Sequence, residues 1–143
     1  MKRRKILLVE DNLAHVRLIQ EAFKESQLSH EMVAVKDGVE AMEYLHQRPP
    51  YENAVLPDVI LLDLNLPRKD GREVLAELKG NPNLSQIPVL VLTTSNNDED
   101  IQESYRLHAN CYIQKSQNLQ QLLSIIETIQ RFWLEIVTLP LDA

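Results

Sequence analysis

The chain has 143 residues, with 15 Lys and Arg against 21 Asp and Glu, and a formal net charge of −6. This length fits one domain, and 44% hydrophobic residues suffice for a buried core, built mainly from Leu, Ile and Val. The negative charge disfavours nucleic-acid binding, and the longest apolar runs are far too short to span a membrane. A lone cysteine, Cys111, and the lack of a secretory signal favour a cytoplasmic protein.

Five short apolar runs alternate with segments of helical periodicity, which predicts a (βα)5 domain of the α/β class. The first, third and fourth runs are apolar throughout, as in central parallel strands covered on both faces, whereas the second is mixed and suits an edge. We therefore expect one doubly wound parallel sheet. The predicted strands are Lys5–Val9, Glu31–Val35, Val59–Asp63, Val89–Thr93 and Cys111–Gln114.

Two intervening segments carry local signals. Asn97 is expected to cap the fourth helix, with Asp98, Glu99 and Asp100 in the first turn, where the helix dipole favours negative charge. A metal site there is less favoured, because three consecutive residues on a helix point in different directions. The segment Gln47–Pro57 is longer than a typical connection and is expected to form an irregular lobe.

The carboxyl-terminal helix has more apolar surface than a monomer needs. A core stripe is expected from Leu119, Leu122, Leu123, Ile126, Ile129 and Trp133. Ile125, Phe132 and Ile136 widen this apolar arc to about half the circumference, which favours a homodimer through this helix. The alternative is that the tail of the chain folds back over the helix.

Polar residues gather where the predicted parallel strands end. Glu10 and Asp11 follow the first strand, Asp63 ends the third, Thr93 ends the fourth, and Lys115 follows the fifth. Carboxyl ends of parallel strands meet at one edge, which is where doubly wound sheets bind ligands. Each residue alone has an ordinary structural explanation, but all five at one edge favour a functional site.

The chemistry of this edge points to a divalent cation and phosphoryl transfer. Three crowded carboxylates repel one another unless a cation neutralises them, and oxygen ligands without His or Cys favour Mg²⁺. Asp63 directly follows a buried apolar strand, so it is the best candidate for a nucleophile. A carboxylate can accept a phosphoryl group as an acyl phosphate when a metal ion and an ammonium stabilise the transferring oxygens.

Four segments resemble the motifs of the response regulator receiver domain: Ile6–Asn12, Val59–Gly71, Pro88–Thr94 and Cys111–Lys115. The resemblance covers residues 5 to about 130, with the motifs in order. The Pro49-Pro50 loop, residues 107–116 and the tail 132–140 are further similar to small regulators paired with cyanobacterial and bacterial phytochrome kinases.

The resemblance implies a role for each residue of the site. Asp63 would be the phosphoacceptor, and Mg²⁺ would be held by Glu10, Asp11, Asp63 and the backbone carbonyl of Asn65. Thr93 and Lys115 would contact the phosphoryl group, and Tyr112 would change its rotamer with Thr93. Tyr112 could equally be an ordinary strand residue with its hydroxyl at the surface.

The resemblance also implies a flavodoxin-like fold with strand order 2-1-3-4-5, and a single receiver domain over residues 1–143 without an output domain. Its partners would be a sensor histidine kinase, such as a phytochrome-type kinase, and a further protein that the sequence does not identify. It would be a signalling protein rather than an enzyme. A haloacid-dehalogenase-like phosphatase is the main alternative. That family has an acid two residues after the nucleophile, and Asn65 at this position cannot act as a general acid or base. An inactive receiver fold that serves only for interactions is a third hypothesis.

The remaining candidates are weaker. Receiver domains usually have a cis proline after the lysine, so Ser116 leaves the shape of that loop open. Cys111 is expected to be an inert thiol rather than a redox sensor. Four scattered histidines, namely His15, His30, His46 and His108, show no metal-ligand spacing and are expected to be ordinary surface residues.

Overall fold

The computed structural model describes residues 3–24 and 30–142. Its strands form one parallel sheet in the order β2-β1-β3-β4-β5, so the predicted fold class and strand order are confirmed. Four strands match the predicted bounds, and the third ends at Leu62, one residue before the predicted Asp63. The strands are β1 (Lys5–Val9), β2 (Glu31–Val35), β3 (Val59–Leu62), β4 (Val89–Thr93) and β5 (Cys111–Gln114).

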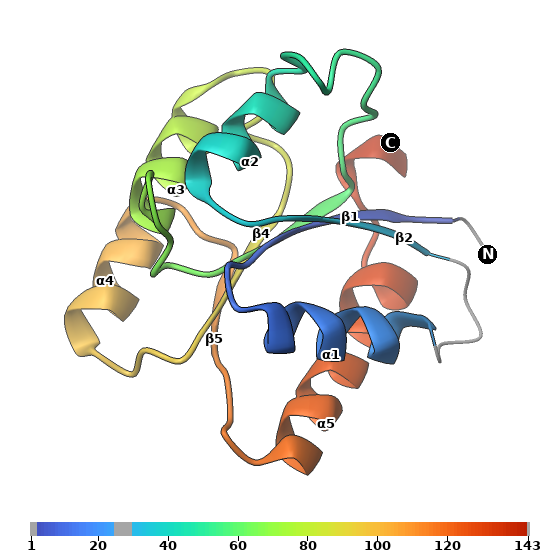
Figure 1. The fold of residues 1–143 in the computed structure, drawn as a ribbon, viewed down its shortest axis with the longest axis vertical. Coiled ribbons are helices and arrows are strands. Elements are labelled where there is room, and N and C mark those ends of the chain that lie inside the picture. The colour runs from blue at the N-terminus through green and yellow to red at the C-terminus, as the bar shows by residue number, and fades with distance from the viewer. Residues whose placement is uncertain (1–2, 25–29, 143) are drawn as a thin grey trace.

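Helices cover both faces of this sheet. Figure 1 shows α1 (Leu13–Lys24) and α5 (Leu119–Ile129) on one face, and α2 (Gly38–Leu45), α3 (Gly71–Gly80) and α4 (Asp98–Arg106) on the other. Successive strand residues point to opposite faces, so the chain forms two cores. In β1, Ile6 and Leu8 join the core beneath α1 and α5, whereas Leu7 and Val9 join the core beneath α2 and α3.

Burial follows the hydrophobicity of the strands. All residues of β3 and β4 are buried, while β2 pairs only with β1 among the described strands and is largely half-buried. The predicted edge and central strands are therefore confirmed. Each fully buried Leu, Ile or Val side chain contributes roughly 1.5–3 kcal/mol to the stability of this sandwich.

The expected helix cap and irregular lobe are both present. Asn97 Oδ1 accepts a 2.8 Å hydrogen bond from the N–H of Glu99, so Asn97 caps α4 as predicted. Asp100, in the first turn of α4, pairs with Arg72 of α3 and accepts a hydrogen bond from Ser95 Oγ. Between α2 and β3 the described chain has no helix or strand, which confirms the lobe at Gln47–Pro57.

The prediction for the carboxyl-terminal helix was only partly right. Leu119 is 55% exposed, because it lies at the start of α5 beyond the cover of the sheet. After α5 the chain continues as a π-helix, η1 (Gln130–Ile136), whose wider turn shifts the buried face. Leu134 is therefore buried, whereas the predicted Trp133 is only half-buried. The expected core residues that are buried are Leu122, Ile126 and Ile129.

The tail of the chain folds back onto the protein. Leu139 is 1% exposed, and the short helix η2 (Pro140–Asp142) brings Asp142 to Arg4 at the start of the chain. The guanidinium of Arg4 donates hydrogen bonds of 2.6 and 2.7 Å to the two carboxylate oxygens of Asp142. This fold-back still leaves Phe132 and Ile136 exposed, at 48% and 64%. None of the helices in the described part of the chain is long and apolar enough to traverse a membrane.

Candidate phosphoryl-transfer site

Backbone hydrogen bonds fix the polar residues at the ends of the strands. The N–H of Glu10 donates to the carbonyl of Val35, and the N–H of Asp63 donates to the carbonyl of Val9, each at 3.0 Å. The N–H of Lys115 donates to the carbonyl of Thr93 at 2.7 Å. Each of these hydrogen bonds extends the pairing of the strands by one residue. The sheet therefore fixes the backbone positions of Glu10, Asp63 and Lys115.

The three predicted carboxylates do meet at this edge. One carboxylate oxygen from each of Glu10, Asp11 and Asp63 lies within 4.8 Å of the others. Glu10 is 2% exposed and Asp63 is 9% exposed, while Asp11 faces solvent. Within residues 3–24 and 30–142, this is the one group of three or more His, Cys, Asp and Glu side chains able to hold a metal ion.

Lys115 reaches the same cluster from β5. Its side chain is 1% exposed, and its ammonium donates a hydrogen bond to Asp63 Oδ2 at 3.1 Å and makes a close ion pair with Glu10 Oε1. Two buried carboxylates therefore share one buried cation. The sequence prediction that these charges gather at one edge is correct in its geometry.

One ammonium does not balance three carboxylates, and the electrostatics of Glu10 reflect this. Burial is the largest cause that raises the pKa of Glu10, from 4.5 to about 7. The hydrogen bond from Lys115 opposes this rise, and the charge of Asp63 adds to it. A further positive charge at this edge would remove much of the cost of keeping Glu10 ionised.

The other predicted site residues lie around this cluster. Thr93 is fully buried, and its Oγ1 accepts a 3.4 Å hydrogen bond from the N–H of Ser95. Tyr112 is half-buried, and its hydroxyl donates a 2.8 Å hydrogen bond to the carbonyl of Ser95. The N–H of Asn65 donates to Asp63 Oδ1 at 3.3 Å, which holds the loop after β3 close to the acid.

His15 belongs to the site, although the sequence interpretation treated it as a scattered surface residue. Its Nδ1 lies 3.1 Å from Lys115 Nζ and 3.8 Å from Glu10 Oε1, and its side chain is 30% exposed. The hydrogen bonds that Asn12 Oδ1 accepts from the N–H groups of Ala14 and His15 fix the start of α1. The sequence did contain one indication of this role. His15 lies in the first turn of α1, which follows Glu10 and starts at the same edge of the sheet.

The weaker candidates remain outside the cluster. His30 Nδ1 accepts a 3.0 Å hydrogen bond from the N–H of Arg4, and His46 pairs with Glu77, so neither is an isolated surface residue. Burial raises the pKa of the Cys111 thiol to about 11, which keeps it in the unreactive protonated form. Among the described residues the one cis peptide joins Pro49 and Pro50, so the bond before Ser116 is trans.

Comparison with known proteins identifies the class. Residues 6–127 match the family model of the response regulator receiver domain, and the chain belongs to this family. The haloacid-dehalogenase-like alternative is therefore wrong. Membership explains the fold and the strand order, and it agrees with the expectation of a signalling protein.

Particular relatives narrow the resemblance to regulators of phytochrome signalling. The chain is 57% identical over 135 residues to response regulator Rcp1 of Synechocystis sp., covering 94% of this chain and 92% of Rcp1. The structure of the Mn²⁺-bound form of Rcp1 matches with a TM-score of 0.93 at 56% identity, over 96% of this chain and 99% of the other. The phosphorylated cyanobacterial phytochrome response regulator RcpA matches with a TM-score of 0.95 at 60% identity, over 97% and 99%.

Proposed function

We propose that this chain receives a phosphoryl group on Asp63 from a sensor histidine kinase and signals by association with other proteins. The observation that carries the proposal is the position of Asp63, whose carboxylate is nearly buried, next to the buried ammonium of Lys115 and the carboxylates of Glu10 and Asp11. The Mn²⁺-bound Rcp1 and phosphorylated RcpA structures support it by similarity.

The residues at this edge suit Mg²⁺. The donors are carboxylate oxygens, and the excess of negative charge over Lys115 gives a hard divalent cation a favourable site. Glu10, Asp11, Asp63 and the backbone carbonyl of Asn65 would hold it. When bound, Mg²⁺ neutralises negative charge on the phosphoryl oxygens and on the carboxylates around them.

The chemical step assigns one role to each side chain. An Asp63 carboxylate oxygen attacks the phosphorus of phosphohistidine, forming an O–P bond as the P–N bond breaks. The electron pair of the broken bond stays on the imidazole nitrogen, which takes a proton. The Lys115 ammonium, already 3.1 Å from Asp63 Oδ2, stabilises charge on the transferred group.

The signal would leave the site through the segment after β4. Thr93, buried at the end of β4, would turn its hydroxyl toward the phosphoryl group. Ser95 accepts the hydrogen bond from Tyr112 and donates one to Asp100 of α4. Movement of Thr93 and Ser95 would therefore release Tyr112 and alter how α4 and β5 face a partner.

The kinase partner is proposed from similarity. The relatives include a regulator described as a cyanobacterial phytochrome response regulator, so a phytochrome-type histidine kinase is the first candidate donor. We propose the cytoplasm as the place of this exchange, which the lone cysteine supports, because an internal disulfide would need a second cysteine.

Phosphorylation by a small acyl phosphate tests the proposal without a kinase. With Mg²⁺ and acetyl phosphate, the parent should gain one base-labile phosphoryl group per chain. Asp63→Asn should gain none, and chelation of divalent cations should abolish the reaction in the parent. Equal modification of the parent and Asp63→Asn would contradict the assignment of the phosphoacceptor.

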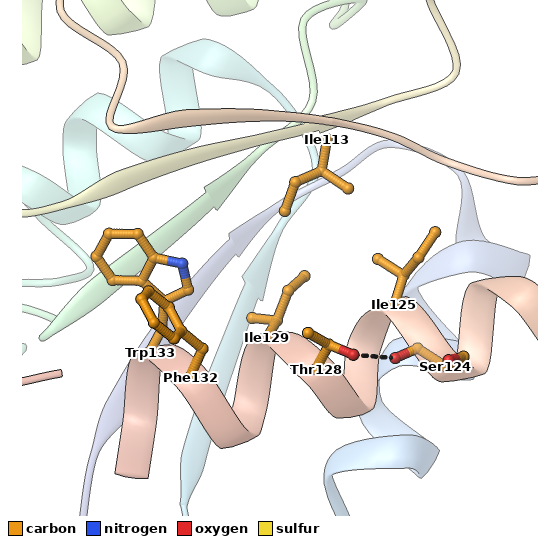
Figure 2. Close-up of a pocket in the computed structure, with 7 residues that line it drawn as sticks. All are labelled: Ile113, Ser124, Ile125, Thr128, Ile129, Phe132 and Trp133. Carbon is orange, nitrogen blue, oxygen red and sulfur yellow. Dashed lines mark hydrogen bonds between the residues drawn. The ribbon is translucent and has the colours of Figure 1, made fainter. Parts of the chain in front are cut away.

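We further propose that a second copy of the chain covers the exposed apolar surface of α5 and η1. A groove of about 310 Å³ lies between these helices and Ile113 of β5. Figure 2 shows Ile125, Ile129 and Phe132 among its lining side chains on the helical side. Phe132 and Ile136 stay exposed although the tail has folded back, so nothing in the described chain covers them.

A twofold contact would bury the same side chains on both copies. Full burial of each large apolar side chain contributes roughly 1.5–3 kcal/mol, so the two copies together could offset the entropy cost of association. Sedimentation at matched micromolar concentrations should find a dimer for the parent and a weaker one for Phe132→Asp. Val55→Asp is the control, since Val55 is 65% exposed in the lobe away from α5. Monomers of the parent would contradict the dimer, and an undisturbed Phe132→Asp dimer would place the interface elsewhere.

A further inference from the structure

The ammonium of Lys115 has three partners in the structure, and one of them is not an acid. It contacts Glu10 Oε1, Asp63 Oδ2 and His15 Nδ1, the last two at 3.1 Å. A lysine ammonium has three N–H groups and no acceptor, so His15 Nδ1 must accept and the proton of this imidazole must lie on Nε2. Burial and the nearby charge of Lys115 lower the pKa of His15, which agrees with a neutral ring.

His15 differs from the carboxylates of Glu10 and Asp63 because it is not among the residues proposed to bind Mg²⁺. Glu10 and Asp63 belong to the acidic cluster proposed to hold Mg²⁺, so both are shared between the ammonium and the cation. The Nδ1 atom of His15 is a hydrogen-bond acceptor for Lys115 and lies 3.8 Å from Glu10 Oε1, beyond hydrogen-bond distance. His15 can therefore keep its hydrogen bond to Lys115 when the carboxylates of Glu10 and Asp63 bind the metal ion.

We propose that His15 is a positioning residue, which holds the Lys115 ammonium beside Asp63 so that phosphoryl transfer meets an oriented positive charge. This inference rests on the proposed phosphoacceptor role of Asp63. A neutral acceptor suits the task better than a third carboxylate in contact with Lys115, because it orients the ammonium without adding negative charge where phosphoryl oxygens arrive.

The start of α1 fixes the backbone from which the imidazole of His15 projects. The Oδ1 atom of Asn12 accepts hydrogen bonds from the N–H groups of Ala14 and His15 at 3.0 and 3.2 Å. The N–H of Asn12 in turn donates to Glu10 Oε2 at 3.1 Å. The turn that carries His15 is thus hydrogen-bonded to Glu10, the acid that also pairs with Lys115. Glu10 therefore links the backbone near His15 to the ammonium of Lys115.

Substitution at position 15 can separate the acceptor atom from the bulk of the ring. His15→Asn keeps an acceptor oxygen close to where Nδ1 stands, His15→Leu keeps volume without an acceptor, and His15→Ala serves if the leucine variant fails to fold. The first readout is the rate at which the Lys115 ammonium protons exchange with water, measured by NMR. This measurement needs neither a metal ion nor a phosphoryl donor. The second is the initial rate of phosphorylation by acetyl phosphate at saturating Mg²⁺.

His15→Leu should accelerate ammonium exchange and slow phosphorylation by about tenfold, the size expected for one hydrogen bond to a charged group. Its Mg²⁺ affinity should stay within about twofold of the parent, and His15→Asn should recover both rates to within about threefold. Parent-like exchange and phosphorylation in His15→Leu, or a His15→Asn variant no better than His15→Leu, would overturn the proposal. If the parent itself takes no phosphoryl group, the proposed function fails, while the exchange readout still tests the contact.

Discussion

Glu10→Gln is predicted to stabilise the metal-free protein at neutral and alkaline pH, although it removes a residue proposed to bind Mg²⁺. The cause is the burial of an ionised carboxylate that is 2% exposed and shares one ammonium with Asp63. Glutamine keeps the shape of the side chain and an oxygen acceptor for Lys115, but it carries no charge to desolvate.

The sign and size of the effect follow from the pKa of Glu10. A carboxyl group whose pKa is higher in the folded state binds its proton more tightly when folded. The free energy of unfolding therefore falls as pH rises from about 4.5 to about 7, and the full cost remains above pH 7. A pKa shift of this span corresponds to roughly 3 kcal/mol, which Glu10→Gln should recover at pH 8 but not at pH 4.

Urea unfolding of the parent and of Glu10→Gln at pH 4 and pH 8, with divalent cations chelated, measures this difference. Saturating Mg²⁺ should reduce or reverse the advantage of Glu10→Gln at pH 8, because the cation stabilises only the folded parent. Asp11→Asn is the matched control, since it removes the same charge from an exposed position where little desolvation cost is recovered. A Glu10→Gln variant that is less stable than the metal-free parent at pH 8, or equally changed at both pH values, would show that burial of the Glu10 charge does not destabilise the protein.

Three further predictions follow from the packing around the site and the tail. Asp142→Asn should lower the free energy of unfolding by about 2–3 kcal/mol in urea unfolding, since the buried guanidinium of Arg4 loses its hydrogen-bonded carboxylate and keeps the more distant Asp58 at 3.8 Å, and a change below about 0.5 kcal/mol would contradict this. Gly71→Ala should cost about 1–3 kcal/mol and slow phosphorylation, because a Cβ there overlaps backbone atoms just after β3. The control Gly80→Ala has no atom within 4 Å of the added Cβ and should do neither. Lys115→Ala should still bind Mg²⁺ but, once phosphorylated, should lack the chemical-shift changes at the end of β4 that the parent shows by NMR.

The strands were predictable because burial on both faces demands continuous apolar residues. β1, β3 and β4 are such runs, and the polar residues that follow them were correctly expected at one edge of the sheet. Asn97 was recognisable as a helix cap from its residue type and the acids after it. Local chemistry thus determined most of the fold and the carboxylate cluster.

Two features had no local signal. The π-helix η1 changes the helical period, so a spacing of 3.6 residues assigned Trp133 to the core where Leu134 lies. The ion pair between Arg4 and Asp142 joins residues 138 positions apart, and nothing in either neighbourhood indicates it. Both depend on how the end of the chain packs against the finished sheet.

His15 was missed for a different reason. Ligand residues are recognised in a sequence by the spacing between two or more of them. His15 has no other histidine at such a spacing. Its contact with Lys115 joins residues 100 positions apart and appears only when α1 and β5 are placed in space.

Transfer of a labelled phosphoryl group from an autophosphorylated phytochrome-type histidine kinase, followed by mapping of the modified residue, tests whether Asp63 is the phosphoacceptor. In the presence of Mg²⁺, label should leave the kinase and appear on the peptide that contains Asp63. Asp63→Asn should accept no label under the same conditions. Label on another residue, or transfer to Asp63→Asn at the rate of the parent, would contradict this assignment.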